Sequence, residues 1–325
     1  MKLASLKSGG RDGTLVVIDE HLQRAAAVPE HAATLQAALD EWERIAPALE
    51  SVYEGLNTDA SRGFAVDVND LAAPLPRAYQ WLDASAYLSH LERVRRARGA
   101  DMPPHMYADP LMYQGGSDGS LGPRDPIPAA DEAWGVDFEA EVAVVTDDVP
   151  MGTPAEAAAD HIKLLMLVND VSLRNLIPDE IAKGFGFVHG KPANAYSPVA
   201  VTPGTLGDAW RDHRVHLPLT CRVNGETVGA PLAGEDLHFG FDRLIAHAAK
   251  SRRLGAGTII GSGTVSNQDA TRGCACLIEK RTLELLDIGE IQTPFLKHGD
   301  RVTIEMLDGD GNSVFGAIDQ TVTPA

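Results

Sequence analysis

Two glutamates, Glu139 and Glu141, are separated by a single residue within the strand-like run 135–145. Successive side chains of a strand point to opposite faces, so residues two apart point the same way. The two carboxylates therefore share one face, where burial costs on the order of several kcal/mol per group unless a cation compensates their charges. A divalent metal ion is the simplest compensation, and a solvated face of an edge strand is the alternative.

Two further acidic residues stand where a regular element begins or ends. Asp83 lies just ahead of a predicted helix, where it is either a ligand or only a helix cap. Asp170 follows the apolar run 164–169, so it lies at the end of a buried element and requires a partner. The candidate ligands are carboxylates, and the sequence has no convincing set of His and Cys ligands. Mg²⁺, Ca²⁺ or Mn²⁺ is therefore favoured over zinc.

One histidine and one lysine accompany these acids. His90 lies seven residues after Asp83, about two helical turns along, where a neutral imidazole could take a proton from water. A lone histidine on a helix is, however, commonly a surface or core residue. Lys191 follows a glycine-rich loop that lacks phosphate-loop spacing and has Pro192 in place of the required Ser or Thr. Since residues 261–264 are too short for a dinucleotide fingerprint, a nicotinamide or flavin enzyme is excluded.

The composition excludes several classes of partner. The net charge of −18 argues against nucleic acid and, weakly, against anionic membrane surfaces. The chain shows no secretory signal and no apolar stretch of the roughly 18 to 20 residues that a spanning helix needs. The three cysteines suit a reducing compartment, so we expect a cytoplasmic protein. Cys274 and Cys276 could form half a zinc site but are better interpreted as small core residues.

The pattern of apolar residues divides the chain into two units. Residues 3–28 resemble short strands and residues 29–56 carry helical periodicity. The proline-rich joint 71–76 then marks a boundary. We therefore expect a small N-terminal α/β domain over residues 1–76 and a larger domain over residues 77–325.

The second unit is rich in predicted strands. Helices are expected over residues 85–98, 155–163 and 241–251, and an apolar run over residues 164–168. Strands are expected within residues 215–223, 258–260 and 301–306. Because these strands do not alternate regularly with long helices, a doubly wound fold is excluded and the fold class is α+β, β-rich.

Five short motifs occur in order along this second unit. They are Asp83-x₆-His90, Glu139-x-Glu141, Asn169-Asp170-Val-Ser-Leu-Arg174, Gly190-Lys191 and Gly261-Ser-Gly-Thr264. As an ordered set with compatible spacings, they make the chain resemble the fumarylacetoacetate hydrolase family. The resemblance runs from about residue 78 to the C-terminus, and the first seventy or so residues resemble the small N-terminal domain of two-domain bacterial members.

The resemblance implies a mixed β-roll for the catalytic domain and a homodimer. It implies a Mg²⁺ or Ca²⁺ ion, with Mn²⁺ as a further option, bound by Asp83, Glu139, Glu141 and Asp170. The residues that match catalytic positions are His90, its acidic orienting partner Glu279, and the substrate- and oxyanion-binding residues Arg174 and Lys191. Those that match substrate contacts are Tyr113, Thr264 and Arg98.

The activity that the resemblance implies is metal-dependent cleavage of a carbon–carbon bond in a 1,3-diketo acid. The substrate would be a small molecule of the fumarylacetoacetate or acylpyruvate type, in the catabolism of tyrosine or of other aromatic compounds. The alternatives are a hydratase, an isomerase or an oxaloacetate-type decarboxylase of the same family. A non-catalytic protein that binds a small acid is the alternative from a different class.

Four positions depart from the hydrolase pattern. They are Ser85, Ile177, Ile181 and Ala195, where the hydrolase has tyrosine, glutamine, tyrosine and threonine. The metal ligands and the His/Glu pair are intact, so the resemblance implies that the chemistry is retained. Because the changed positions touch the substrate or lie near the metal, the sequence leaves the identity of the substrate open.

Overall fold

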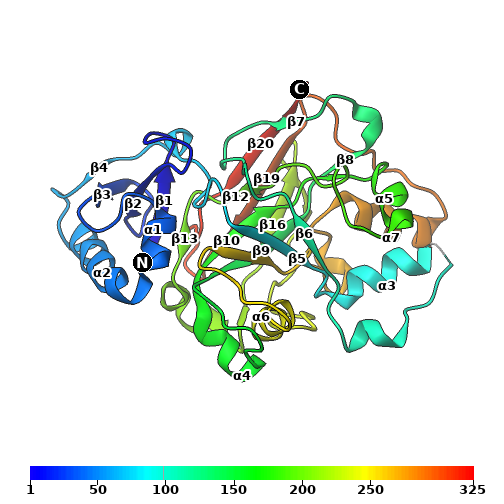
Figure 1. Cartoon of the computed structure of the whole chain (residues 1–325). Coiled ribbons are helices and arrows are strands. Elements are labelled where there is room, and N and C mark those ends of the chain that lie inside the picture. The colour runs from blue at the N-terminus through cyan, green and yellow to red at the C-terminus, as the bar shows by residue number, and fades with distance from the viewer. Residues whose placement is uncertain (98) are drawn as a thin grey trace.

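A computed structural model describes residues 1–97 and 99–325 of the chain. Its main layer is a long sheet that begins in the N-terminal unit, drawn in blue in Figure 1, and continues into the larger body. In spatial order the strands are β4 (Phe64–Ala65), β3 (Arg24–Ala27), β2 (Thr14–Ile18), β1 (Lys2–Leu6), β13 (Ala200–Val201), β10 (Ile162–Asn169), β9 (Ala140–Thr146), β18 (Thr258–Gly261), β5 (Gln80–Ala84) and β6 (Met112–Gly115), with β12 (Ala195–Tyr196) paired to β10.

A second, shorter sheet lies beside the first. Its order is β17 (Glu226–Gly229), β16 (Leu219–Val223), β19 (Arg301–Met306), β20 (Ile318–Thr323) and β7 (Ile127–Pro128). Two small ribbons pair β8 (Val136–Asp137) with β11 (Ser172–Leu173) and β14 (Trp210–Arg211) with β15 (Arg214–Val215). Parallel pairing of β5 with β18 and of β7 with β20 makes the sheets mixed. The prediction of a β-rich α+β fold is confirmed.

The central strands β9 and β10 are buried on both faces. In β10, Leu164 and Met166 face one hydrophobic core, which includes residues of the N-terminal helices. Leu165 and Leu167 point to the opposite core. A strand that is covered on both sides needs a near-continuous apolar sequence rather than an alternating one, and the run from Ile162 to Val168 supplies it.

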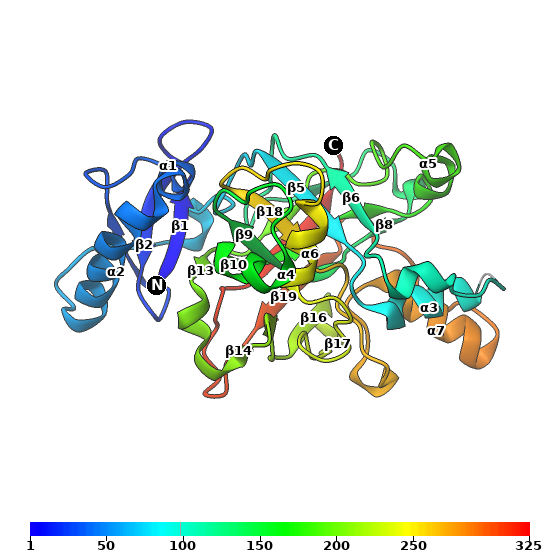
Figure 2. The same ribbon diagram turned by 60° about the horizontal axis from the view of Figure 1, so that its bottom comes forward.

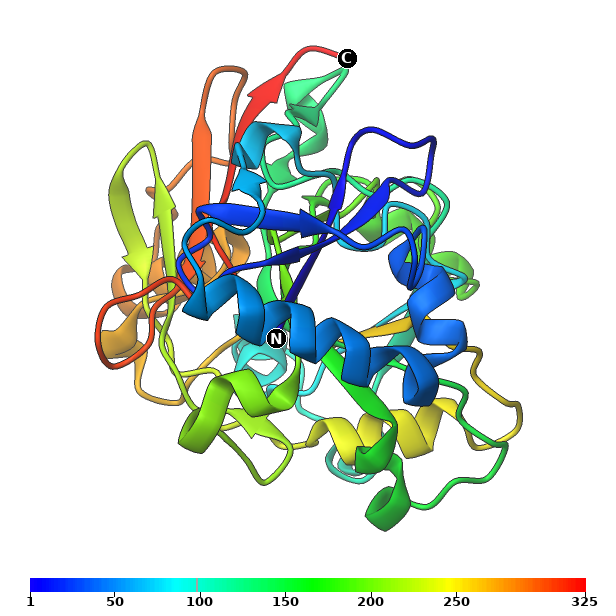
Figure 3. The same cartoon turned by 90° about the vertical axis from the view of Figure 1, so that its left-hand side faces the viewer.

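Seven α-helices lie in the described ranges: α1 (Leu35–Asp40), α2 (Trp42–Thr58), α3 (Leu88–Ala97), α4 (Ala155–Ala158), α5 (Ile177–Lys183), α6 (Phe241–Ala248) and α7 (Leu277–Ile288). Helices α1 and α2 pack on the N-terminal strands, and Figure 3 shows α2 running across them. Helices α3 and α7 lie side by side at the opposite end of the molecule (Figure 2). None of the described helices combines the length and apolarity needed to cross a bilayer.

Several predicted helix limits were wrong. The helix expected over residues 85–98 begins only at Leu88, because β5 extends through Ala84. The helix expected over residues 29–56 is two helices that meet at Glu41. The helix expected over residues 155–163 ends at Ala158, so that Ile162 can begin β10.

Two helices were not predicted, although both carry local signals. Pro178 lies in the first turn of α5, and Gly184 follows its last residue with a positive φ of 77°. Helix α7 is composed largely of strong helix formers and is followed by Gly289 at a φ of 80°. The omission of α7 matters because it carries Glu279 in its first turn.

Candidate active site

Four buried carboxylates in or next to three strands of the long sheet, β5, β9 and β10, lie close together. Each of Asp83, Glu139, Glu141 and Asp170 offers an oxygen within 4.8 Å of the others. Asp83 lies in β5, Glu141 lies in β9 and Glu139 directly precedes it, while Asp170 directly follows β10. The β9–β10 pairing fixes the last two together, because the Asp170 amide donates to the Glu139 carbonyl at 2.9 Å.

A glycine lets the outer acid reach the others. Strand β18 separates β5 from β9, and its Gly261 is in register with Asp83. A Cβ atom on Gly261 would lie 2.6 Å from Asp83 Oδ1 and 2.8 Å from Glu141 Oε2, which is closer than real Cβ contacts allow. Glycine therefore leaves the space in which the Asp83 and Glu141 carboxylates approach each other.

The chemistry of this donor set fits a hard divalent cation. Glu141 is fully buried, and neither of its carboxylate oxygens receives a hydrogen bond from the described part of the chain. Burial, together with the charges of the neighbouring acids, raises the pKa of Glu141 and of Asp83 well above the usual range. Carboxylate oxygens without other donors, once they have lost their protons, are the ligands that Mg²⁺, Ca²⁺ and Mn²⁺ prefer.

Two basic side chains close the other side of the cluster. Lys191 Nζ lies 2.8 Å from Glu139 Oε2 and 2.5 Å from Asp170 Oδ2. Arg174 Nη2 lies 2.5 Å from Glu139 Oε1. Burial opposes ionisation of Glu139, but the charges of Arg174 and Lys191 outweigh it and hold the pKa of Glu139 below its ordinary value. The Tyr113 hydroxyl donates to both oxygens of Asp170, at 3.0 and 2.9 Å.

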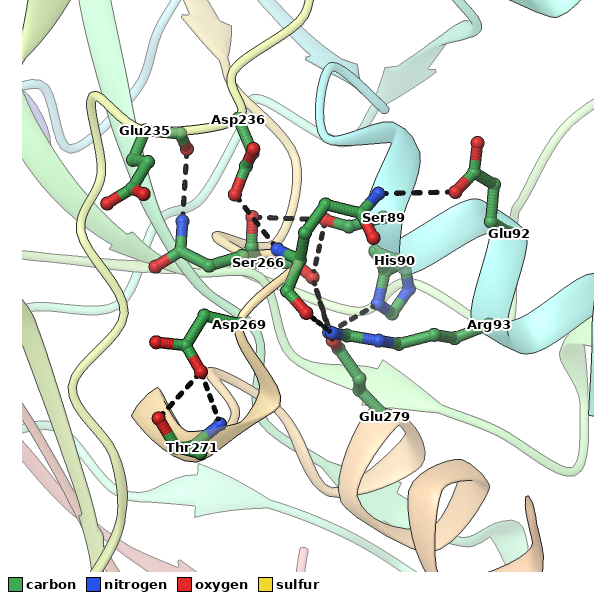
Figure 4. A network of polar contacts seen from close by, with 12 residues as sticks. Ser89, His90, Glu92, Arg93, Glu235, Asp236, Ser266, Asp269, Thr271 and Glu279 are labelled. Atoms are coloured by element: carbon green, nitrogen blue, oxygen red, sulfur yellow. Dashed lines mark hydrogen bonds and ion pairs between the residues drawn. The ribbon is translucent and has the colours of Figure 1, made fainter. Parts of the chain in front are cut away.

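A histidine and a glutamate form a second polar group. His90 Nδ1, on α3, lies 2.9 Å from Glu279 Oε2, on α7. The other oxygen of Glu279 accepts from Ser266 Oγ at 2.7 Å and forms an ion pair with Arg93. Figure 4 shows these side chains converging between the two helices. Burial opposes ionisation of Glu279, but His90, Ser266 and Arg93 hold the pKa of Glu279 below its usual value.

This arrangement defines the state of the imidazole. Because Glu279 is ionised, it accepts a hydrogen bond from His90 Nδ1, and Nε2 is left as the basic nitrogen. The pair can therefore remove a proton from a neighbouring acid or from water, with Glu279 stabilising the imidazolium that forms.

Both groups contribute residues to the lining of one cavity of about 490 Å³, the second group through His90. The site residues in its lining are Asp83, His90, Tyr113, Glu139, Arg174, Lys191 and Thr264. A larger hollow of about 1110 Å³ lies between α2 and residues 308–314, and no predicted site residue is among those lining it in the described chain. The chemistry of the lining, rather than the size of the hollow, therefore selects the smaller cavity.

The structure brings together nearly all of the predicted site residues, with two corrections. Asp83 is not a helix cap: it is a strand residue whose Oδ1 accepts from the Gly263 amide at 3.1 Å. The two-turn helical spacing to His90 was therefore also wrong, since His90 reaches the cavity from α3, a separate element. Arg98, predicted to contact the substrate, lies outside the described residues.

Asp137 is a further buried acid beside the site, and it was not predicted from the sequence. The signal was its spacing, because Asp137, Glu139 and Glu141 are each two residues apart. Asp137 is fully buried, and its Oδ1 accepts from the Leu277 amide at 2.8 Å. Its Oδ2 accepts from the Ile278 amide at 3.0 Å and from Arg174 Nε at 2.8 Å. One carboxylate thus connects the helix of Glu279 to the arginine that contacts Glu139.

Two family models together match almost the whole chain. The family model "Fumarylacetoacetate (FAA) hydrolase C-terminal" matches residues 80–323, and "Fumarylacetoacetase N-terminal domain 2" matches residues 1–77. The rat mitochondrial oxaloacetate tautomerase is 26% identical over 301 residues, covering 80% of this chain and 86% of that protein. The corresponding Xenopus laevis protein is 29% identical over 159 residues, covering 48% of this chain and 47% of that protein.

Solved structures share the fold. A fumarylacetoacetate hydrolase from Exiguobacterium antarcticum superposes with a TM-score of 0.65 at 18% identity, covering 100% of both chains. A fumarylpyruvate hydrolase from Pseudomonas aeruginosa, in complex with Mn²⁺ and pyruvate, superposes with a TM-score of 0.56 at 14% identity. That match covers 76% of this chain and 91% of the other.

The raised pKa values give metal binding a defined pH dependence. Asp83 and Glu141 hold protons more tightly folded than unfolded, so their contribution favours the folded state below the unfolded pKa of about 4. That contribution is lost as the pH rises through the folded pKa values. Because Mn²⁺ competes with these protons, we expect it to raise the melting temperature of metal-stripped protein more at about pH 8 than at about pH 5.5.

Thermal melts with added Mn²⁺ or with EDTA measure this difference. Glu141→Gln should remove most of the Mn²⁺-dependent increase, because it removes a buried anionic ligand. Glu226→Gln, at an exposed carboxylate of β17, is the matched control and should retain the full increase. Equal increases at the two pH values would contradict the assignment of these acids as ligands.

Asp137 should influence metal binding through Arg174 and Glu139. Asp137→Asn places an amide against the donors of Arg174 and α7, so we expect a loss of about 3 kcal/mol in unfolding free energy. We also expect Mn²⁺ affinity of the folded protein to fall by about tenfold, as for other partners that orient a ligand. Calorimetric titration measures it. Asp269→Asn, at an exposed carboxylate that contacts only Thr271 and Arg272 among the described residues, is the control, and wild-type affinity in folded Asp137→Asn would refute the link.

Proposed function

Because the chain belongs to the fumarylacetoacetate hydrolase family, we propose that it is a metal-dependent hydrolase that cleaves a carbon–carbon bond in a 1,3-diketo acid. The observation that supports the proposal is the His90–Glu279 pair, whose His90 lines the same cavity as Asp83 and Glu139 of the carboxylate cluster. A base held beside a metal site suits the activation of water. A protein that only bound a small acid would need the carboxylates but not this pair.

The four carboxylates of Asp83, Glu139, Glu141 and Asp170 would hold the divalent ion, for which Mg²⁺, Mn²⁺ and Ca²⁺ are all suitable. When bound, such an ion polarises a carbonyl of the diketo acid and stabilises negative charge on the enolate. The remaining chemistry belongs to the side chains of the chain itself.

His90 would begin the reaction as a general base. Its Nε2 takes a proton from water while Nδ1 donates to Glu279, and the water oxygen bonds to the carbonyl carbon of the acyl group. Positive charge from Lys191 and Arg174, which line the cavity, stabilises the oxyanion that forms, and one preorganised donor of this kind is worth about 3 kcal/mol of barrier.

The carbon–carbon bond then breaks. The electron pair of that bond passes to the carbon next to the second carbonyl, and the proton taken up by His90 supplies the one that this carbon needs. One water is consumed and two acids are released, so the atoms balance. The low pKa of Glu279 supports this cycle, because an ionised partner stabilises the imidazolium between the two proton transfers.

A second candidate is supported by the names of the sequence relatives. The rat and Xenopus laevis proteins are oxaloacetate tautomerases. Tautomerisation moves a proton between carbon and oxygen, so it would use His90 as a base but would consume no water. The same cavity serves both reactions, and the products distinguish them.

Product analysis tests the two candidates directly. Acylpyruvates and oxaloacetate are supplied to the Mn²⁺-loaded protein, and products are identified by proton NMR, with EDTA as the control. We expect metal-dependent formation of pyruvate and a second acid from an acylpyruvate. Enol–keto exchange of oxaloacetate without any carbon–carbon cleavage of acylpyruvates would overturn the hydrolase proposal in favour of the tautomerase.

The role of His90 can be separated from metal binding. His90→Asn removes the base while keeping a polar side chain of similar size, so we expect turnover to fall by about 10²-fold to 10⁴-fold. Mn²⁺ affinity should stay as in the wild type, because His90 is not among the four acids. Steady-state kinetics and calorimetric titration measure the two effects. Turnover within a few-fold of wild type would show that His90 is not the base.

A further inference from the structure

The active-site cavity has two chemically distinct halves. The inner half carries two of the carboxylates, Asp83 and Glu139, together with His90, Lys191 and Arg174. The outer half is lined mainly by large apolar side chains. They include Leu91 and Val94 of α3, Ile177 and Ile181 of α5, and Leu111 and Phe187.

Helices α3 and α5 contribute four of these side chains, and together the six residues form the apolar wall of the cavity. Leu91 and Val94 are three residues apart, and Ile177 and Ile181 are four residues apart, so each pair lies on one face of its helix. Ile177 and Ile181 are also two of the positions at which the sequence departs from the hydrolase pattern. The apolar character of this half therefore depends on residues that are particular to this chain.

Part of this wall is open to solvent. The side chain of Ile181 is 55% exposed and that of Leu111 is 39% exposed, although both line the cavity. Large apolar side chains at the mouth of a cavity favour a ligand group that removes them from water. A charged group against these side chains would lose hydration without gaining a partner from them.

Most of the cationic side chains of the cavity form ion pairs with buried acids. Lys191 contacts Glu139 and Asp170, and Arg174 contacts Asp137 and Glu139. Among the described residues of the outer half, the cation is Arg95, whose Nε donates to the Asp101 carbonyl at 2.8 Å.

We infer that the acyl arm of the substrate, the part beyond the cleaved bond, is uncharged and apolar. The substrate class is an acylpyruvate with an aliphatic or aryl acyl group rather than a dicarboxylic one. This inference rests on the proposed function, because it identifies the substrate of the same site. The inner half binds the diketo acid, and the two isoleucines, Leu91, Val94 and Phe187 contact the arm.

A chain-length series tests the inference. The value of kcat/KM is measured for acetylpyruvate, butanoylpyruvate, hexanoylpyruvate, benzoylpyruvate and fumarylpyruvate with Mn²⁺-loaded protein. Each added methylene should raise kcat/KM by up to about fourfold until the wall is covered, the factor that about 0.8 kcal/mol per buried methylene gives. Hexanoylpyruvate should exceed fumarylpyruvate, whose arm ends in a carboxylate, by at least about tenfold. A flat series, or a preference for fumarylpyruvate, would overturn the inference.

Variants at two isoleucines of equal exposure provide the matched control. Ile181→Gln should lower the ratio of hexanoylpyruvate to acetylpyruvate kcat/KM by about fivefold or more, because it places an amide on the wall. Ile288→Gln, at a residue of α7 that is 56% exposed and does not line the cavity, should leave the ratio unchanged. Arg95→Ala should affect all arms alike. A selective loss of fumarylpyruvate turnover in Arg95→Ala would show that Arg95 binds a carboxylate and would refute the inference.

A binding experiment separates this inference from the proposed function. Straight-chain 2-oxo acids from 2-oxobutanoate to 2-oxooctanoate are titrated into Mn²⁺-loaded protein by calorimetry, where no turnover is needed. Affinity that increases with chain length in the wild type, and less so in Ile181→Gln, supports the apolar wall even if acylpyruvates are not cleaved. Affinity that does not depend on chain length contradicts the apolar wall even if acylpyruvates are cleaved.

Discussion

Each of the four carboxylates offers an oxygen within 4.8 Å of the others, and all four side chains are buried. Their mutual repulsion and lost hydration oppose folding, so the rest of the site is arranged around compensating charge. Lys191 and Arg174 supply it on one side, through Glu139 and Asp170. On the other side Glu141 receives no donor from the described chain, and the pKa of its carboxylate rises accordingly. A divalent cation would supply positive charge that the described residues do not provide on this side.

The observed strand order brings these acids together. Asp83 and Glu141 belong to strands that are separated by β18. Because residue 261 of β18 is a glycine, which has no side chain, the two carboxylates can approach each other. The proposed catalytic pair, His90 and Glu279, is positioned by a different packing contact, between α3 and α7. Asp137 connects the two groups, because it accepts hydrogen bonds from the start of α7 and from Arg174. The cluster and the helix of Glu279 are thus linked through Asp137 and Arg174 by hydrogen bonds and an ion pair.

The sequence predicted those features that depend on local periodicity. The period of two along the strand placed Glu139 and Glu141 on one face, and the apolar run of β10 placed Asp170 at a buried strand end. The element that carries Asp83 was assigned wrongly, because its strand is defined by parallel pairing with β18, about 175 residues away. No local signal in residues 80–87 reveals that partner. Family resemblance supplied Glu279, whereas the contacts that hold it, from Ser266 and Arg93, are visible only in three dimensions.

The central claim is that these four acids bind one hard cation. Anomalous diffraction from a crystal grown with Mn²⁺, collected at the manganese absorption edge, tests it most directly. We predict a single strong peak in the active-site cavity, coordinated by oxygens of Asp83, Glu139, Glu141 and Asp170. A map without a peak among these carboxylates, or with manganese bound only at another place, would contradict the account.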